Sequence, residues 1–262
     1  MRRVFAIARN TFREAVRNKI LYSLLFFAVL LILSALAVGS LSLHEEVRMT
    51  RDMGLFGIDI FGVIIAVFVG VNLLYKELDL KTVYTILPKP IHRWEFVFGK
   101  WLGMLLTLVV QVSVMGLVLA GTLAAQGAGL DGPTVKALWL LYVNVVVVTS
   151  IAVFFSAFSS PFLSGFFALG CFIVGRSVPD IRALGAQIGD GGARTFLDGA
   201  AMLLPNLHLF YPSGTIIGSE TVSVHGNFVS AGYLMWTTLY GLGYSAIVLV
   251  LAMLVFRKRD FV

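Results

Sequence analysis

The sequence predicts an all-α, polytopic membrane protein with six transmembrane helices, built as a single domain over residues 1–262. Of these residues, 58% are hydrophobic and 13% are charged, whereas a soluble domain carries about 25% charged residues. Several apolar runs are long enough to cross the ~30 Å hydrocarbon core of a bilayer as helices. This composition excludes an ordinary soluble enzyme, and the predicted location is the cytoplasmic (inner) membrane.

The predicted spans are separated by charged or glycine-rich segments. Ile20–Leu43 has no charged residue over 24 positions, and the polar stretch HEEVRMTRD that follows is predicted as a loop. Ala137–Gly175 is charge-free for 39 residues, which is too long for one crossing at about 1.5 Å per residue. The serines around Pro161 therefore indicate the turn of a hairpin. The spans are expected at about residues 20–43, 55–75, 101–125, 137–158, 162–178 and 231–256.

Residues 2–19 are predicted to form a basic amphipathic helix before the first span. On a helical wheel, Phe5 and Phe12 share the apolar side with four smaller residues. This pattern is typical of an interfacial helix in the lipid headgroup plane. The alternative is an ordinary positively charged flank of the first span. The basic side comprises Arg2, Arg3, Arg9, Arg13 and Arg17.

The segment 176–230 is polar overall but contains short apolar pieces, among them AAMLLPNLHLFYP and GTIIG. Each piece is too short to span a bilayer. Such pieces suit re-entrant helices that dip into the outer leaflet, or helices that cap the bundle.

The segment 76–100 has the spacing of a short amphipathic helix with a firm end. Its apolar residues recur at i, i+3, i+4 and i+7 from Leu80, and Glu77 precedes Lys81 by four residues, the favourable order for an ion pair. Pro88 and Pro90 end the helix, because proline lacks the N–H group and disfavours helix in the preceding residue. We interpret the segment as a surface beside the membrane to which a partner attaches.

The positive charges predict the orientation of the chain. With six spans, fourteen Lys and Arg residues fall on the side of the termini and of residues 76–100, and six fall on the other side. The positive-inside rule then places both termini and this segment in the cytoplasm. The formal net charge of +6 is explained by topology and does not indicate nucleic-acid binding.

A few polar side chains lie inside the predicted spans. Asp59 lies near the outer end of span 2, where an acid can reach headgroups or water, and a structural role is favoured over one in transport. Asn72, Gln111 and Asn144 either line a path or hydrogen-bond between helices, and the second interpretation is favoured. The four histidines show no metal-binding spacing, so no metal site is predicted.

The whole chain resembles the permease subunits of ABC-2 type transporters. The resemblance rests on Glu77-x-x-x-Lys81-Thr82, Pro88-Lys89-Pro90-Ile91-x-Arg93 and Gly99-Lys100. In the family these positions read E-x-x-x-G-T, P-[IV]-x-R and G-K, so Lys81 stands where the family has glycine. Leu204-Pro205-Asn206-Leu207 and the terminal Phe256-x-x-Arg259-Asp260-Phe261 are also similar.

The resemblance implies that residues 77–88 are a cytoplasmic coupling helix that docks into an ATP-binding subunit. Gly99 and Lys100 would anchor the start of the third span. The chain contains no GxxxxGK[ST] sequence, so ATP and Mg²⁺ are expected in that separate subunit and not here. The residues assigned to coupling are Glu77, Lys81, Thr82, Tyr84, Leu87, Pro88, Pro90 and Arg93.

The resemblance also implies an export function and a second permease copy or a paralogue, since a six-span half does not enclose a pathway alone. Membrane lipid is the remaining expected partner. The alternative function is a membrane scaffold or maturation factor, for example in copper-enzyme maturation, that uses ATPase-driven motion to act on a periplasmic partner. The sequence does not identify a substrate.

Overall fold

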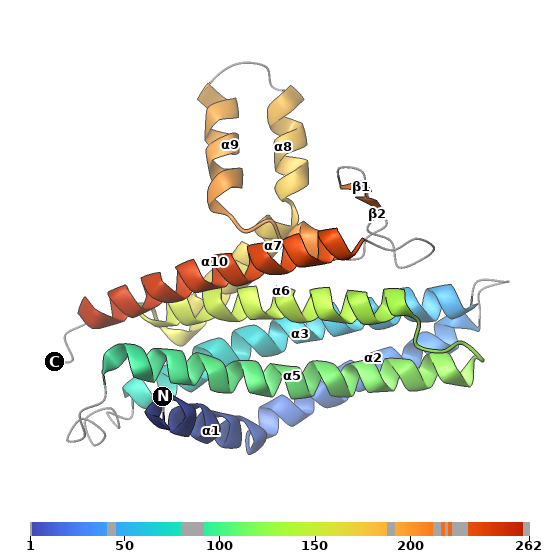
Figure 1. Cartoon of the computed structure of the whole chain (residues 1–262), viewed down its shortest axis with the longest axis horizontal. Helices are drawn as coiled ribbons and strands as arrows, with labels where there is room; N and C mark the ends of the chain where they lie inside the picture. Colours follow the sequence, from blue (N-terminus) through green and yellow to red (C-terminus); the bar gives the residue numbers. More distant parts are fainter. Residues whose placement is uncertain are drawn as a thin grey trace.

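The computed structural model describes residues 2–40, 46–79, 92–187, 192–211, 216–217, 220–221 and 230–258. Within these residues the chain is almost entirely helical, and the long helices form one elongated bundle (Figure 1). The elements are α1 (Arg2–Val16), α2 (Lys19–Gly39), α3 (Glu46–Asp79), α5 (Arg93–Ala125), α6 (Gly132–Ser156), α7 (Pro161–Arg176), α8 (Val178–Gln187), α9 (Gly192–Leu203), the 3₁₀ helix η1 (Leu207–Phe210), β1 (Ile216–Ile217), β2 (Glu220–Thr221) and α10 (Ala231–Lys258).

Five helices in the described part of the chain are long and apolar enough to cross a membrane: α2, α3, α5, α6 and α10. A sixth crossing is formed if α7 and α8, which are bent by 57° relative to each other, count as one broken span. The predicted all-α membrane fold is confirmed, and the number of crossings is five or six. The fifth predicted span therefore ends in a bend between Arg176 and Val178.

Helix α6 is the central element of the bundle. Its residues from Leu140 to Val153 are buried, except for the half-buried Tyr142, and it packs against α3, α5, α7 and α10. Asp131 caps its N-terminus by accepting a hydrogen bond from the Thr134 N–H group at 3.2 Å, and Pro133 lies in its first turn. Both are favourable starts for a helix, because they satisfy or remove N–H groups that have no partner within the helix.

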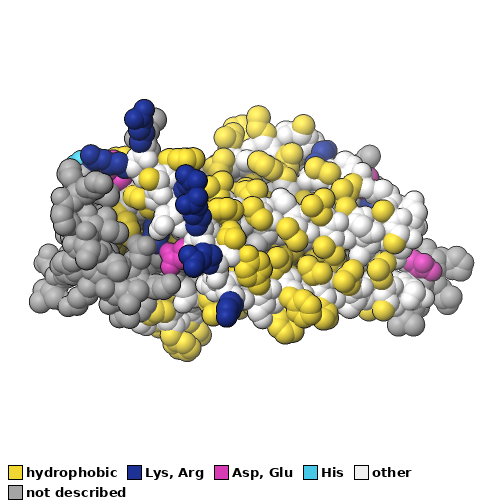
Figure 2. Space-filling view, turned by 90° about the horizontal axis from the view of Figure 1, so that it is seen from below, with side chains coloured by type: hydrophobic (Ala, Val, Ile, Leu, Met, Phe, Trp, Pro, Cys, Tyr) yellow, Lys and Arg dark blue, Asp and Glu magenta, His cyan; other side chains and the backbone are white. Residues whose placement is uncertain are grey.

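Large apolar side chains cover the outside of the bundle. Examples are Phe26 on α2, Leu117 on α5, Phe162 on α7 and Trp236 on α10. In the view from below, hydrophobic side chains occupy the middle of the molecule and Lys and Arg side chains gather toward one end (Figure 2). Contiguous exposed apolar surface of this extent is rare in soluble monomers and is expected for helices that cross a bilayer.

Two helices, α3 and α5, begin more than two turns earlier than the sequence predicts. The HEEVRMTRD stretch, expected as a loop, contains the first two turns of α3 from Glu46. It is helical because Val47, Thr50 and Gly54 fall at helical spacing on the side toward the bundle, where Thr50 donates a hydrogen bond to the Ala35 carbonyl of α2 at 3.3 Å. Helix α5 begins at Arg93, before the expected residue 101, because Glu95 accepts a hydrogen bond from the His92 N–H group in a capping box.

The N-terminal helix is separate from the first span. The chain turns at Asn18, whose side chain accepts a hydrogen bond from the Ile20 N–H group at 3.0 Å and thereby caps α2. Helix α1 lies along the first turns of α5. Ala8, Thr11 and Ala15 form its buried face, while Phe5 and Val16 are exposed beside it.

The segment after α7 forms a helical hairpin that stands away from the bundle. Helices α8 and α9 pack on each other and project across the bundle axis (Figure 1). The chain then returns to the bundle through η1, which contacts α6, α7 and α8. β1 and β2 pair antiparallel over two residues each, with Ile216 opposite Thr221.

Candidate functional site

Asp59 lies at the centre of a buried polar cluster, which we call the Asp59 junction. Its carboxylate is fully buried on α3. Oδ1 accepts a hydrogen bond from the Asn144 side-chain amide of α6 at 2.9 Å. Oδ2 accepts one from the guanidinium group of Arg176, at the last turn of α7. Helices α3, α6 and α7 are therefore joined through one carboxylate.

Arg176 is held by more than its ion pair. Its guanidinium carbon lies 3.6 Å from the centre of the Tyr211 ring, directly after η1, and 6.0 Å from that of Phe172. The side chain retains 26% exposure, so Arg176 is less buried than the carboxylate that it contacts. Stacking on aromatic rings orients its planar donors toward Asp59.

Position 175, directly before Arg176, requires glycine. A Cβ atom on Gly175 would lie 2.6 Å from the Pro205 carbonyl oxygen, so glycine allows the chain returning from α9 to approach α7. There the Asn206 N–H group donates to the Tyr240 hydroxyl at 2.9 Å, and the Tyr233 hydroxyl donates to the Leu209 carbonyl at 2.9 Å. The Leu204–Leu207 motif thus lies where the projecting hairpin rejoins α7 and α10.

His208 of η1 lies in the same region, outside the candidate spans. Burial lowers the pKa of its imidazole, and the positive charge of Arg176 lowers the pKa further, against a smaller opposing effect of Asp180. The neutral form of His208 is therefore favoured in the folded protein.

A second ion pair joins α1 to α5. Lys100 is only 2% exposed, and its Nζ atom lies 3.6 Å from Glu14 Oε2 on α1. The helices approach closely at two glycines: a Cβ on Gly99 would lie 2.8 Å from Ile7 Cβ, and one on Gly103 would lie 2.5 Å from the Ala8 carbonyl oxygen. Lys100, predicted to anchor span 3 at the headgroups, contacts the N-terminal helix, because glycine spacing brings α1 against it.

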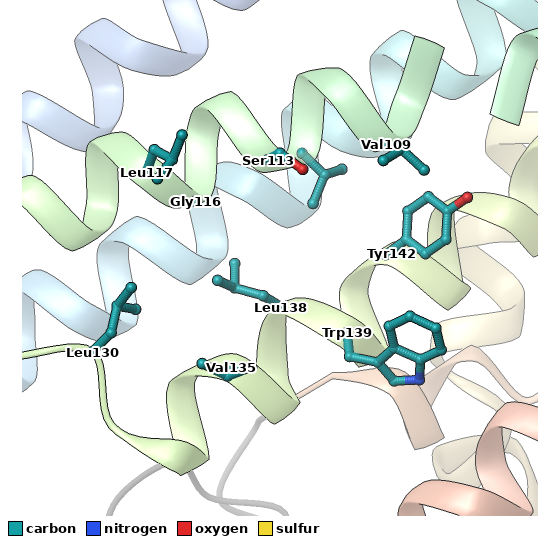
Figure 3. Close-up of a pocket in the computed structure, with 10 residues that line it drawn as sticks. Val109, Ser113, Gly116, Leu117, Leu130, Val135, Leu138, Trp139 and Tyr142 are labelled. Carbon is teal, nitrogen blue, oxygen red and sulfur yellow. The ribbon is translucent and has the colours of Figure 1, made fainter. Parts of the chain in front are cut away.

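Two apolar grooves open on the sides of the bundle. The α5/α6 groove has a volume of about 470 Å³, and Figure 3 shows its lining residues on α5, on α6 and, at Leu130, on the loop between them. Gly116 narrows the distance between the helices, since a Cβ there would lie 3.2 Å from Leu138 Cδ1. The groove is lined by Val109, Val112, Ser113, Gly116, Leu117, Leu130, Val135, Leu138, Trp139 and Tyr142.

The α3/α7 groove is similar in size, about 480 Å³, and includes Phe162, which is 86% exposed, together with Asn72. Grooves of this size and polarity accept acyl chains or the apolar side chains of a partner. Within the part of the chain that the structure describes, no group of three His, Cys, Asp or Glu residues could hold a metal ion.

The other predicted site residues are placed as follows. Asn72 donates to the Phe68 carbonyl of its own helix at 3.0 Å. Gln111 is buried on α5, and its Oε1 has no hydrogen-bond partner among the described residues. Glu77 lies in the last turns of α3, Arg93 is the first residue of α5, and residues 80–91, with the rest of the predicted coupling helix, lie outside the described residues. In the N-terminal segment, Phe12 is half-buried, and the exposed residues are Arg2, Arg3, Phe5, Arg9 and Arg13 on α1 and Arg17 directly after it.

Sequence reasoning assigned no role to Arg176, Glu14 or Tyr211. For Arg176 a signal was available: it ends the long charge-free run of the fourth and fifth spans, and Asp59 is the acid inside a span. An acid at membrane depth calls for a positive partner at similar depth. For Glu14 and Tyr211 the sequence shows no comparable signal.

The described helices define a multi-pass membrane protein. The chain belongs to the ABC-2 transporter family: the family model described as ABC-2 family transporter protein matches residues 5–261. It is therefore a permease component of an ABC transporter. No curated protein matches the chain.

Proposed function

We propose that the chain is the permease subunit of an ATP-driven ABC-2 export system that works with a separate ATP-binding subunit. The observation that carries the proposal is the arrangement at one end of the bundle. Helix α1, the end of α3, the start of α5 and the end of α10 all lie there (Figure 1). A subunit that pushes on this end acts on four helices at once.

The proposed coupling segment connects two of these helices. It begins in the last turn of α3, which ends at Asp79, and it precedes α5, which begins at Arg93. Helix α3 packs against α6 and carries Asp59, and α5 carries Lys100. We therefore expect a load on Glu77–Leu87 to reach the Asp59 junction along α3, which is one continuous helix from Glu46.

The orientation is part of the proposal. Fourteen of the twenty Lys and Arg residues fall on the side of the termini, which supports cytoplasmic termini in the inner membrane. Helix α1 then lies in the headgroup region of the cytoplasmic leaflet, with Phe5 and Val16 facing lipid. The end of the bundle where α3 begins and α5 ends then faces the opposite side (Figure 1).

A second permease copy or a paralogue completes the proposed transporter. The exposed apolar side chains of α7, among them Phe162 and Phe166, and the α3/α7 groove form the wall that we propose for the pathway. Asp59 accepts hydrogen bonds from both Asn144 and Arg176. This arrangement supports an interhelical role for the two side chains over a lining role.

The test is co-expression with an ATP-binding subunit encoded beside this chain. We expect the two proteins to co-purify and the complex to hydrolyse ATP, and we expect a reporter after Val262 to be cytoplasmic while one near Gly191 is not. Failure of every neighbouring ATP-binding protein to co-purify would contradict the proposal. Two reporters on the same side would contradict the topology alone.

A further inference from the structure

A polar crevice of about 800 Å³ opens where α1 meets α2 and α3, and we call it the basic crevice. Its lining is Asn10, Arg13, Glu14, Arg17, Asn18, Lys19 and Asn72. Asn10, Arg13, Glu14 and Arg17 fall at i, i+3, i+4 and i+7, so one face of α1 forms a wall of the crevice. The volume is in the range of small-ligand sites.

Among the described residues, the positive charge in the crevice is not balanced. Its one acid, Glu14, is paired with the buried Lys100 at 3.6 Å. Arg13, Arg17 and Lys19 are exposed, and within the described part of the chain their side chains have no ion-pair or hydrogen-bond partner. Three positive charges therefore face a hollow in which the described residues supply no matching anion.

Two further features favour an anion in this place. The crevice includes Asn18 and Lys19 at the N-terminus of α2, where the helix dipole is positive. On the opposite side, Asn72 uses one N–H bond for the Phe68 carbonyl, and an amide has a second to donate. The donors thus come from three helices.

The position of the crevice decides between a soluble anion and a lipid. Lys19 is the first residue of a helix that is apolar and long enough to span the membrane, so the crevice lies at headgroup depth. Val16, Ile20 and Tyr22 next to it are exposed apolar or aromatic side chains. They offer a surface for acyl chains directly beside the cations.

We propose that the basic crevice binds the phosphate headgroup of an anionic phospholipid, with Arg13, Arg17 and Lys19 as the phosphate ligands. The site is separate from the proposed coupling segment. Arginine suits this task because its planar group donates two parallel hydrogen bonds to phosphate oxygens. A bound lipid would hold α1 in the headgroup plane, next to the Glu14–Lys100 pair.

The test uses the full-length protein purified in mild detergent, where no membrane surface contributes. Phosphatidylglycerol is titrated in mixed micelles, and bound lipid is counted by native mass spectrometry. We expect the double variant R13Q/R17Q to bind about 25-fold more weakly, taking about 5-fold for each basic residue at an anionic surface. K19Q alone should weaken phosphatidylglycerol binding about 5-fold. The conservative R13K/R17K variant should retain most of the binding.

The matched control is R2Q/R9Q, which removes two exposed cations of the same helix that do not line the crevice. It should bind phosphatidylglycerol like the unaltered protein. Phosphatidylcholine should not bind, and glycerol phosphate, which has the phosphate without acyl chains, should not displace the lipid at millimolar concentration.

Three results would overturn the proposal. If R13Q/R17Q and R2Q/R9Q lose phosphatidylglycerol binding equally, the lipid is attracted by the net charge of the protein and not by a specific site. Displacement by glycerol phosphate at the concentration at which phosphatidylglycerol binds would assign the crevice to a soluble anion. Unchanged lipid binding in R13Q/R17Q together with loss of the co-purified ATP-binding subunit would make the crevice a protein-docking surface.

Discussion

The guanidinium group of Arg176 is bonded to the carboxylate of Asp59 across 117 positions of sequence. One partner lies at the bend between α7 and α8, and the other lies within α3, a helix that reaches the opposite end of the bundle. The pair therefore links the projecting hairpin to the helix that continues toward the proposed coupling segment.

Arg176→Met should destabilise the protein by about 3–5 kcal/mol, because it leaves the buried carboxylate of Asp59 with Asn144 as its remaining partner. Thermal or denaturant unfolding in detergent measures the effect. Asp59→Asn combined with Arg176→Met should recover part of the loss, since no charge is then buried alone. Arg182→Gln on the exposed face of α8 is the control. If Arg176→Met and Arg182→Gln have the same stability toward unfolding, the Asp59 junction does not stabilise the fold.

Gly103→Val should loosen α1 from α5, because a Cβ at Gly103 would lie 2.5 Å from the Ala8 carbonyl oxygen. Overpacking of this kind costs about 1–3 kcal/mol. The measurement is the rate of trypsin cleavage at Arg13 and Arg17, which should rise. Gly121→Val on the same helix is the matched control, since no atom lies within 4 Å of its added Cβ. Equal cleavage rates for the two variants would contradict close packing of α1 on α5.

His208 should make the fold less stable in mild acid. Burial and then Arg176 lower the pKa of its imidazole in the folded state, so near pH 6 the unfolded chain binds more protons than the folded one. The contribution of His208 to the free energy of unfolding is fully present above its pKa in the unfolded chain, about 6.5. It is lost as the pH falls toward the lower pKa that His208 has in the folded protein. The midpoint of thermal unfolding should therefore drop between pH 7.5 and pH 5.5. In the His208→Gln variant this midpoint should fall less over the same pH range. If the midpoints of the two proteins differ by the same amount at every pH, the prediction is contradicted.

Two changes in the proposed coupling segment should have different effects. Glu77→Ala should weaken attachment of the ATP-binding subunit, by about 0.3–0.5 kcal/mol if its pair with Lys81 is solvated and by more if the complex buries it. Pro88→Gly with Pro90→Gly should preserve attachment of the ATP-binding subunit but uncouple ATP hydrolysis from transport. The reason is that the two prolines stiffen the chain where it leaves the helix.

Co-purification and substrate-stimulated ATP hydrolysis in membranes separate these effects. The double glycine variant should hydrolyse ATP with little transport. If both variants bind the ATP-binding subunit and respond to substrate as the unaltered protein does, residues 77–90 are a solvated loop and the coupling proposal fails.

The sequence by itself determined the class of fold and most of the helices. Runs such as Ile20–Leu43 and Ala137–Gly175 have one stable form in a bilayer, because each backbone polar group must find its partner within the same segment. Serines and Pro161 marked the turn between the fourth and fifth spans, and the structure has a helix beginning at Pro161. The arginine pattern of residues 2–17 likewise indicated a helix before the first span, found as Arg2–Val16.

The tertiary structure decided how the polar groups are paired. Asp59, Asn144 and Arg176 come from three helices, and their meeting depends on how those helices pack, which local patterns do not specify. The same holds for Lys100 and Glu14, which are brought together by the close approach at Gly99 and Gly103. Helix periodicity determines which face a residue occupies. The partner of that face is set by packing between segments distant in the chain, and so it appears only in the folded molecule.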